Sequence, residues 1–348
     1  MGRRALKFKH KPVVLQKASS LPDFRASTVL VANPWKYVDL WLRREKHSEA
    51  RFYWQQAEQF FLASRMLPAT ASPLPAYYCI LNATKALLTA KGQHYGSVHG
   101  VSGGKTLGRK GLRAERVEFR DNGVLPALTR YLGEWKGQEA HSLYELLYNL
   151  PCIHRAFTVT YATSKELFIP VREPRFVVRD GSHECWFEAE VEPAVASGHV
   201  TQKLPTGFER DRGIDDAYIV RRTNRFQWTF TAADEKANLR RLCNYHHSTR
   251  KHMFYVYGSS RLWYLKRAAV GVDGYVEHTC LPIAYAAMHR LSELARYDPL
   301  ALAKHLDARH NWLLTEFIDV VPHQFVDEIA SELTGRDFMP PGVRSSTL

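Results

Sequence analysis

Polar side chains interrupt two strongly apolar stretches of the sequence that are typical of buried helices. Asn82 lies three residues before Lys85, while Ser292 and Glu293 lie four and three residues before Arg296. Each set therefore shares one face of a helix. A buried polar group without a partner costs about 1–3 kcal/mol. If the two helices pack together, Lys85 with Glu293 and Asn82 with Ser292 or Arg296 form a polar network, which either fixes helix packing or lines a binding or catalytic cleft.

A glycine-rich basic stretch, HGVSGGKT, follows the first of these helices and runs from His99 to Thr106, with Lys105 as its cation. A P-loop needs a glycine where His99 stands and leaves a strand rather than a helix, so we exclude a nucleoside triphosphatase of that type. Backbone N–H groups together with Lys105 could still bind the phosphate of a small metabolite. An ordinary flexible connection is the other interpretation.

Other catalytic patterns are missing from the sequence. His246 and His247 are adjacent and cannot both project to one face, and there is neither an HExxH nor a CxxC pattern. We therefore predict no metal site and no cofactor. The five scattered cysteines favour a reducing compartment, which indicates a cytoplasmic protein.

The chain carries 48 Lys and Arg against 35 Asp and Glu, a formal charge of +13. Basic residues are concentrated at 1–17 and at 105–116. Such an excess favours a polyanionic partner, with nucleic acid as the first candidate. A solubilising tail and a solvated loop are the alternative interpretation of the same two clusters.

Hydrophobic periodicity predicts an α+β protein with four parts. They are a basic N-terminal arm at 1–44, a first helical part at 45–165, a β-rich insertion at 166–270 and a second helical part at 281–335. We expect helices at 45–67, 72–91, 124–135, 139–150, 234–245, 281–299, 299–308, 310–320 and 322–334, and a hairpin turning at 258–260. No apolar run is long enough for a membrane span, so no membrane partner is expected.

Two stretches, PLPAYYCILNATKALLTAKGQHYGSVHGV and AYAAMHRLSELARYDP, together resemble the YaaC-like proteins, a bacterial family. The resemblance spans about residues 45–335. The first stretch also resembles the tyrosine-rich helix of HEPN domains, which are helical bundles found as ribonucleases in toxin and antiviral systems and as noncatalytic partners of nucleotidyltransferases. The resemblance implies a HEPN-like helical bundle interrupted by the β-rich insertion.

The resemblance also implies a function. HEPN ribonucleases use an Arg followed after four to six residues by a His, and Arg240 or Arg241 with His246 or His247 meets that spacing. We take Arg241 to hold phosphate and His246 to act as base or acid. The residues expected to bind substrate are Asn82, Lys85, His99, Lys105, Ser292, Glu293 and Arg296.

The predicted protein thus engages nucleic acid, RNA in preference to DNA, as an effector or accessory of bacterial antiviral defence that works without a metal. A homodimer and a protein partner from such a system are expected by analogy. The alternative is a noncatalytic protein–protein interaction module, in which the polar core only specifies packing and the basic arm docks an acidic partner.

Overall fold

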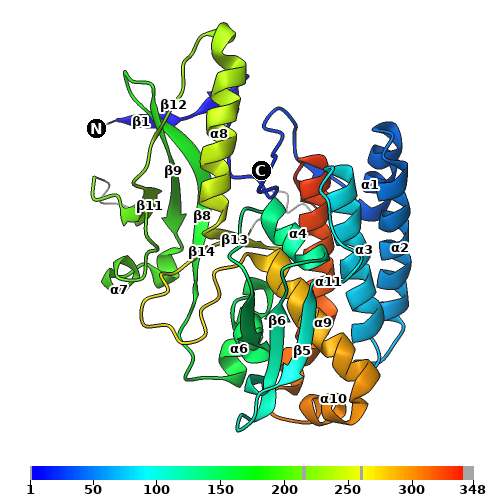
Figure 1. Ribbon diagram of the computed structural model, residues 1–348. Coiled ribbons are helices and arrows are strands. Elements are labelled where there is room, and N and C mark those ends of the chain that lie inside the picture. The colour runs from blue at the N-terminus through cyan, green and yellow to red at the C-terminus, as the bar shows by residue number, and fades with distance from the viewer. Residues whose placement is uncertain (1, 214–216, 259–261, 340–348) are drawn as a thin grey trace. The chain divides into compact units, whose positions relative to one another are not determined.

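The computed structural model describes residues 2–213, 217–258 and 262–339, and it confirms the α+β class (Figure 1). The chain forms two compact units. The sheet unit comprises residues 2–29, 166–271 and 335–339, and the helical unit comprises residues 30–165 and 272–334.

The sheet unit is built on one antiparallel sheet with the strand order β10-β11-β9-β8-β14-β13; β1 also pairs with β8, and β12 with β9. The strands of this sheet are β1 (Arg3–Ala5), β8 (Phe168–Arg179), β9 (Glu184–Val191), β10 (Phe208–Arg210), β11 (Ile219–Arg222), β12 (Phe226–Gln227), β13 (Met253–Val256) and β14 (Leu262–Lys266). Outside it, β2 (Lys7–Phe8) pairs with β3 (Lys11–Pro12), and β15 (Phe338–Met339) belongs to another two-stranded sheet. The unit also contains the short helix α7 (Gly198–Thr201), and the chain leaves it at β4 (Val29–Leu30).

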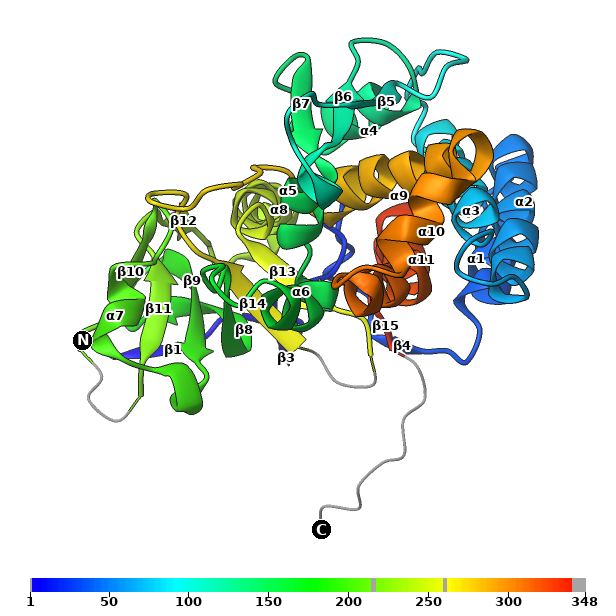
Figure 2. The same ribbon diagram turned by 90° about the horizontal axis from the view of Figure 1, so that it is seen from below.

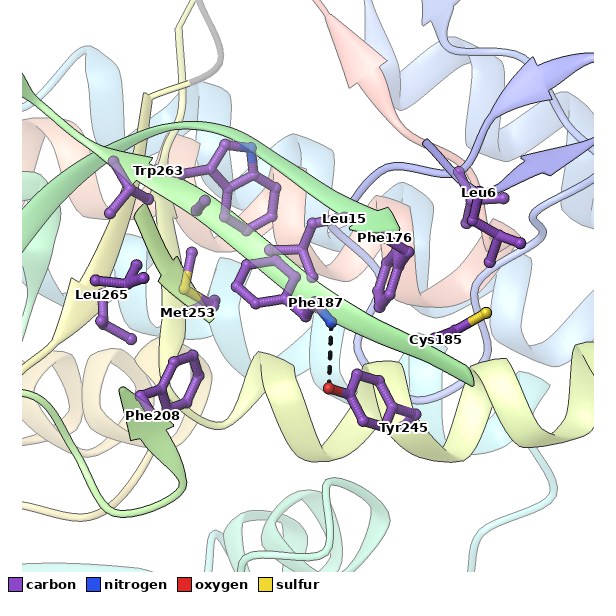
Figure 3. Close-up of a cluster of buried hydrophobic side chains, with 14 of the residues drawn as sticks. Leu6, Leu15, Phe176, Cys185, Phe187, Phe208, Tyr245, Met253, Trp263 and Leu265 are labelled. Atoms are coloured by element: carbon purple, nitrogen blue, oxygen red, sulfur yellow. Dashed lines mark hydrogen bonds between the residues drawn. The ribbon is translucent and has the colours of Figure 1, made fainter. Parts of the chain in front are cut away.

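Helix α8 (Glu235–Arg250) lies along this sheet (Figure 1). Its Leu242 and Tyr245 join the apolar core that Phe176 and Phe187 form on the strands (Figure 3). The Tyr245 hydroxyl accepts the backbone N–H of Phe187 at 3.2 Å, so the helix is fixed to β9 by a polar contact as well as by packing.

The described part of the basic segment at 1–17, residues 2–17, belongs to the sheet unit. The pairing of β1 with β8 sets Arg3 opposite Arg179, and Leu6, Val13 and Leu15 are buried in the core. Apolar residues thus alternate with the basic ones, so one face of the segment packs while the other stays polar. The Arg3 guanidinium also bonds to Asp211 at 3.0 Å. Part of the positive charge in this segment therefore has a structural role.

The helical unit contains three long helices around α3 (Pro73–Ala90), namely α2 (Ser48–Arg65), α9 (Cys280–Tyr297) and α11 (Asn311–Thr334). Its other helices are α1 (Pro34–Arg44), α4 (Val124–Tyr131), α5 (Leu143–Tyr148), α6 (His154–Thr160) and α10 (Pro299–Leu306). Almost every face of α3 is buried, as the apolar sequence predicts. The predicted start at Pro73 and stop at Gly92 are confirmed: Gly92 has φ +63°, and the N–H of Gln93 bonds to the carbonyl of Leu88 at 2.8 Å.

A small antiparallel sheet in the helical unit is the main departure from the predicted elements. Its strands are β5 (Val101–Lys105), β6 (Glu115–Phe119) and β7 (Glu139–Ser142), and β5 and β6 pack against α9 (Figure 2). The glycine-rich stretch predicted as a loop is therefore a strand. The helix predicted at 139–150 begins only at Leu143, because Ser142 and Glu145 form a capping box there.

Two further predictions concern a helix end and a hairpin turn. The break expected at residues 320–322 does not occur, because α11 continues through Pro322. The predicted hairpin is formed by β13 and β14, but residues 259–261, which include most of its predicted turn, lie outside the described residues.

Candidate functional site

Helices α3 and α9 pack against each other, as the polar network suggested by the sequence requires. Both helices are almost entirely apolar where they meet, so the few polar side chains between them are surrounded by low-dielectric protein. Seven side chains form what we call the α3–α9 polar cluster: Tyr77, Lys85, His99, Tyr285, His289, Glu293 and Arg296. His99 comes from the segment between α3 and β5, and the others come from the two helices.

Two tyrosines and two histidines make the inner part of this cluster. The Tyr77 hydroxyl donates to the Tyr285 hydroxyl at 3.2 Å, and the Tyr285 hydroxyl donates to the backbone carbonyl of His99 at 3.0 Å. The ring of Tyr77 lies 5.3 Å from that of His99 and 4.9 Å from that of His289, measured between centroids. The two imidazoles are 5.8 Å apart. The hydroxyl chain therefore fixes the backbone that carries His99.

Both imidazoles are held in the neutral form. Burial lowers the pKa of His289 to about 3, and the nearby charges of Arg296 and Arg290 act in the same direction. The pKa of His99 is also lowered, first by burial and then by the charges of Lys85 and Arg296. A neutral imidazole beside two fixed cations can accept a proton while the cations bind an anion.

Two nitrogen atoms of the cluster have no hydrogen-bond partner among the described residues. They are His289 Nδ1 and Arg296 Nε, and both atoms are buried. Buried polar atoms are nearly always bonded, so each exception calls for an explanation, of which a role in binding or catalysis is one. The cations of Lys85 and Arg296 belong to side chains that are only partly buried. The cluster thus combines buried unsatisfied nitrogens with cations near the surface.

Glu293 connects the cluster to the small sheet. Its carboxylate accepts the backbone N–H of Gly103 at 3.2 Å and pairs with Arg290 at 3.0 Å. A Cβ at position 103 would overlap the side chains of Glu293 and Arg290, so a larger residue there would force both side chains to move. Arg290 in turn bonds to the buried Glu115 at 2.6 Å. The predicted pairing of Lys85 with Glu293 is replaced by these contacts, and the Lys85 ammonium lies 5.5 Å from the Tyr53 ring centroid.

Three residues predicted to bind substrate make contacts elsewhere. The Asn82 amide donates to the carbonyl of Tyr78 in its own helix at 2.8 Å, and the Ser292 hydroxyl donates to the carbonyl of His289 at 2.7 Å. These are local helix contacts rather than the predicted bridge between the helices. Lys105 pairs with Asp298 at 2.8 Å on the surface.

The predicted catalytic pair lies in the sheet unit, on α8. Arg241 and His246 are five residues apart, which turns them about 140° from each other around the helix. His246 is fully buried, its Nε2 accepts the N–H of Gln16 at 3.1 Å, and burial lowers its pKa to about 3. Arg241 donates to the carbonyl of Gln227 at 2.9 Å. Their role in catalysis stays a prediction, which this burial does not favour.

Tyr77, Tyr285 and His289 were missed by sequence reasoning. Glu293 and Arg296 follow His289 by four and seven residues along α9. The three side chains therefore share one face of the helix, and that spacing can be recognised in the sequence. The contact between Tyr77 and Tyr285 has no such signal, because it depends on how two distant helices meet.

A second group of ionisable side chains lies beside a cavity of the helical unit. The cavity has a volume of about 280 Å³, and its walls include Arg109, Arg113, Arg116 and His141. His141, Glu139 and His278 bring three potential metal-ligand atoms within 4.8 Å of one another. This group was not predicted, because the histidines come from segments far apart in the sequence.

Fold and site define an α+β protein in which buried histidines and partly exposed cations meet between two core helices. The chain belongs to the YaaC-like Protein family, whose profile matches residues 15–333. No curated protein and no solved structure matches it. Among the described residues, no helix is both long and apolar enough to cross a membrane.

Proposed function

We propose that this chain engages nucleic acid, RNA in preference to DNA, and that the α3–α9 polar cluster is where it does so. The observation that carries the proposal is the placement of the neutral His99 and His289 beside the cations of Lys85 and Arg296. Lys and Arg bind phosphodiesters by charge and by hydrogen bonds. The overall charge of +13 supports a polyanionic partner of this kind.

An exposed aromatic ring beside the cluster supports single-stranded RNA as the target. Tyr297 is 75% exposed, and the Arg296 guanidinium lies 4.7 Å from its ring centroid. Exposed aromatic rings beside cations bind single strands by stacking on the bases while the cations hold the backbone. Only RNA carries a 2'-hydroxyl from which a neutral His99 can take a proton. In cleavage, His99 would take the proton of the 2'-hydroxyl, and the 2'-oxygen would attack the phosphorus of the phosphate held by Lys85 and Arg296. The bond from phosphorus to the 5'-oxygen would break, and that oxygen would leave with a proton from water, giving a 2',3'-cyclic phosphate.

The HEPN-like interpretation of the helical unit belongs to the same proposal, as do a cytoplasmic location, a homodimer and a role in bacterial antiviral defence. The HEPN resemblance of α3 and the segment that follows it supports the bundle, and by analogy the homodimer and the defence role. The five free cysteines support the cytoplasmic location. The docking-arm alternative is less well supported, because Leu6, Val13 and Leu15 of the arm are buried in the sheet unit.

The test uses labelled single-stranded RNA and DNA of one sequence, with EDTA present and salt varied. Lys85→Ala with Arg296→Ala should weaken RNA binding and lower the salt slope by about 1.4, at about 0.7 for each phosphate contact with a single strand. As a control, the double variant Arg43→Ala with Arg44→Ala removes the same amount of charge from the end of α1. It should leave the RNA affinity and the salt slope nearly unchanged. Equal losses in the two pairs would mean that binding follows net charge rather than this site.

Cleavage is tested in the same samples. If RNA is cut in EDTA, His99→Gln should slow the reaction by about 10²-fold or more, as loss of a general base does. Retention of RNA without cleavage would make the protein a binder. RNA cleavage that His99→Gln leaves unchanged would exclude His99 as the base.

A further inference from the structure

Glu139, His141 and His278 come together on one side of the small sheet of the helical unit. Glu139 and His141 are two residues apart on β7, so they point to the same face. His278 lies just before α9. His141 Nε2 is 3.1 Å from Glu139 Oε2, and His278 Nε2 is 3.4 Å from Glu139 Oε1.

These separations are close to those between ligands of a tetrahedral zinc ion. Bonds of about 2.0–2.2 Å to zinc set neighbouring ligand atoms about 3.3–3.6 Å apart. Two imidazoles and one carboxylate are also a ligand set that leaves the fourth position of zinc open for water. Imidazole nitrogens and a carboxylate suit zinc better than calcium or magnesium, which prefer oxygen ligands alone.

A buried carboxylate orients the His278 imidazole through the ring nitrogen Nδ1, while the other ring nitrogen faces Glu139. Glu134 lies 3.3 Å from His278 Nδ1, and it also accepts the N–H of Thr279 at 3.0 Å and the Thr279 hydroxyl at 2.6 Å. Its position is therefore fixed, and it turns His278 Nε2 toward Glu139. Metal-ligating histidines almost always have such a partner on their other nitrogen.

The ring of Phe119 holds both imidazoles in place. It stacks on His278 at 5.2 Å between centroids and meets His141 edge to face at 5.5 Å. Within the described residues, the buried Glu139 Oε1 has no partner with hydrogen-bonding geometry, although it faces His278. The three groups are thus pre-oriented toward one point without fully satisfying one another.

Two carboxylates approach the His278 imidazole, the buried Glu134 at Nδ1 and the partly buried Glu139 at Nε2. A dication bound by the imidazoles would lie close to both negative charges.

We infer that Glu139, His141 and His278 bind a divalent transition metal, with zinc as the best match, and that Glu134 positions His278 for it. His141 also lines the arginine-walled cavity of about 280 Å³, which provides an entry path and room for a further ligand of the metal. The site is separate in residues from the α3–α9 polar cluster and does not depend on the RNA proposal.

The experiment strips the full-length protein with EDTA, removes the chelator and titrates zinc by calorimetry, with the metal content measured by mass spectrometry. One zinc per chain is expected for the wild type. Glu139→Gln and His141→Gln should each weaken binding by about 100-fold or more, and Glu134→Gln by about 10–100-fold, as for residues that support metal ligands. The exposed His94 provides the control, and His94→Ala should bind zinc as the wild type does.

Melting temperatures distinguish a variant that fails to fold from one that folds but does not bind zinc. Each variant is melted without metal to show that it folds, and then with zinc. Zinc should raise the melting temperature of the wild type and of His94→Ala but not that of His141→Gln. Zinc affinity that is equal in the wild type, Glu139→Gln and His141→Gln, or far less than one zinc per chain, would overturn the inference.

Discussion

Histidines occur in two contrasting regions of this chain, α8 of the sheet unit and the α3–α9 polar cluster of the helical unit. On α8, His246 is enclosed between Phe24 and Phe176 and accepts a backbone N–H from Gln16. In the cluster, the half-buried His99 lies within the fields of two cations.

The difference shows that a short spacing motif records distance along the chain but not the surroundings of each side chain. Arg241 and His246 match a ribonuclease spacing in the sequence, yet one side chain lies in the core and the other bonds to a backbone carbonyl. His99 and Arg296 match no spacing motif, because they meet only when α9 packs on α3. Chemistry depends on what surrounds an imidazole, which local spacing does not encode.

The largest expected effect is on stability, at His246. His246→Ala removes a fully buried ring and the acceptor for the Gln16 N–H, so it should lower the free energy of unfolding by about 2–4 kcal/mol. Denaturant unfolding measures this change, and RNA binding by the folded fraction should not alter. The exposed His199 of α7 is the control, and His199→Ala should change stability by less than about 0.5 kcal/mol. If His246→Ala kept wild-type stability but lost RNA cleavage, His246 would have a catalytic role rather than a structural one.

The next effect is a pH dependence shared by both regions. The pKa values of His246 and His289 are lowered to about 3 in the folded protein, mainly by burial, whereas an unfolded imidazole titrates near about 6.5. The unfolded state therefore binds protons that the folded state excludes. Stability should fall as the pH drops from about 6.5 toward 3, by up to about 1.4 kcal/mol per pH unit for each ring.

His289→Gln tests this pH dependence, because it removes one of the two contributions. Its unfolding free energy, measured between pH 7 and 5, should decline less steeply than that of the wild type, while His94→Gln should follow the wild type. An unchanged decline would show that His289 is not held neutral by its surroundings.

The smallest effect is expected at Asn82, which lies in α3 but bonds within its own helix. Asn82→Ala should cost about 1 kcal/mol or less, since it removes one local hydrogen bond, and RNA affinity should not change. Thermal melting and RNA retention measure the two quantities. A clear loss of RNA affinity would place Asn82 in the binding site, as the sequence predicted.

The elements that the sequence predicted well have local signals. Proline and glycine set the ends of α3, and apolar periodicity identified it as a central helix. The small sheet was missed because Gly103 and Gly104 weaken its strand pattern, and because β5 forms through close approach to Glu293 on α9.

In the candidate sites too, the sequence predicted only those residues that have a local signal. Lys85, His99, Glu293 and Arg296 were singled out from polar spacing and family resemblance, and the structure brings them together. The hydroxyl chain of Tyr77 and Tyr285, and the meeting of His141 with His278, depend on tertiary packing that no local pattern records.

The most direct test of the central claim compares two charge-matched double variants in RNA binding across a salt series. Lys85→Ala with Arg296→Ala alters the α3–α9 polar cluster, and Arg240→Ala with Arg241→Ala alters α8. Melting temperatures first establish that both proteins fold. We predict that only the first pair weakens binding and lowers the salt slope. Loss of binding in the α8 pair, with wild-type binding in the cluster pair, would contradict the account.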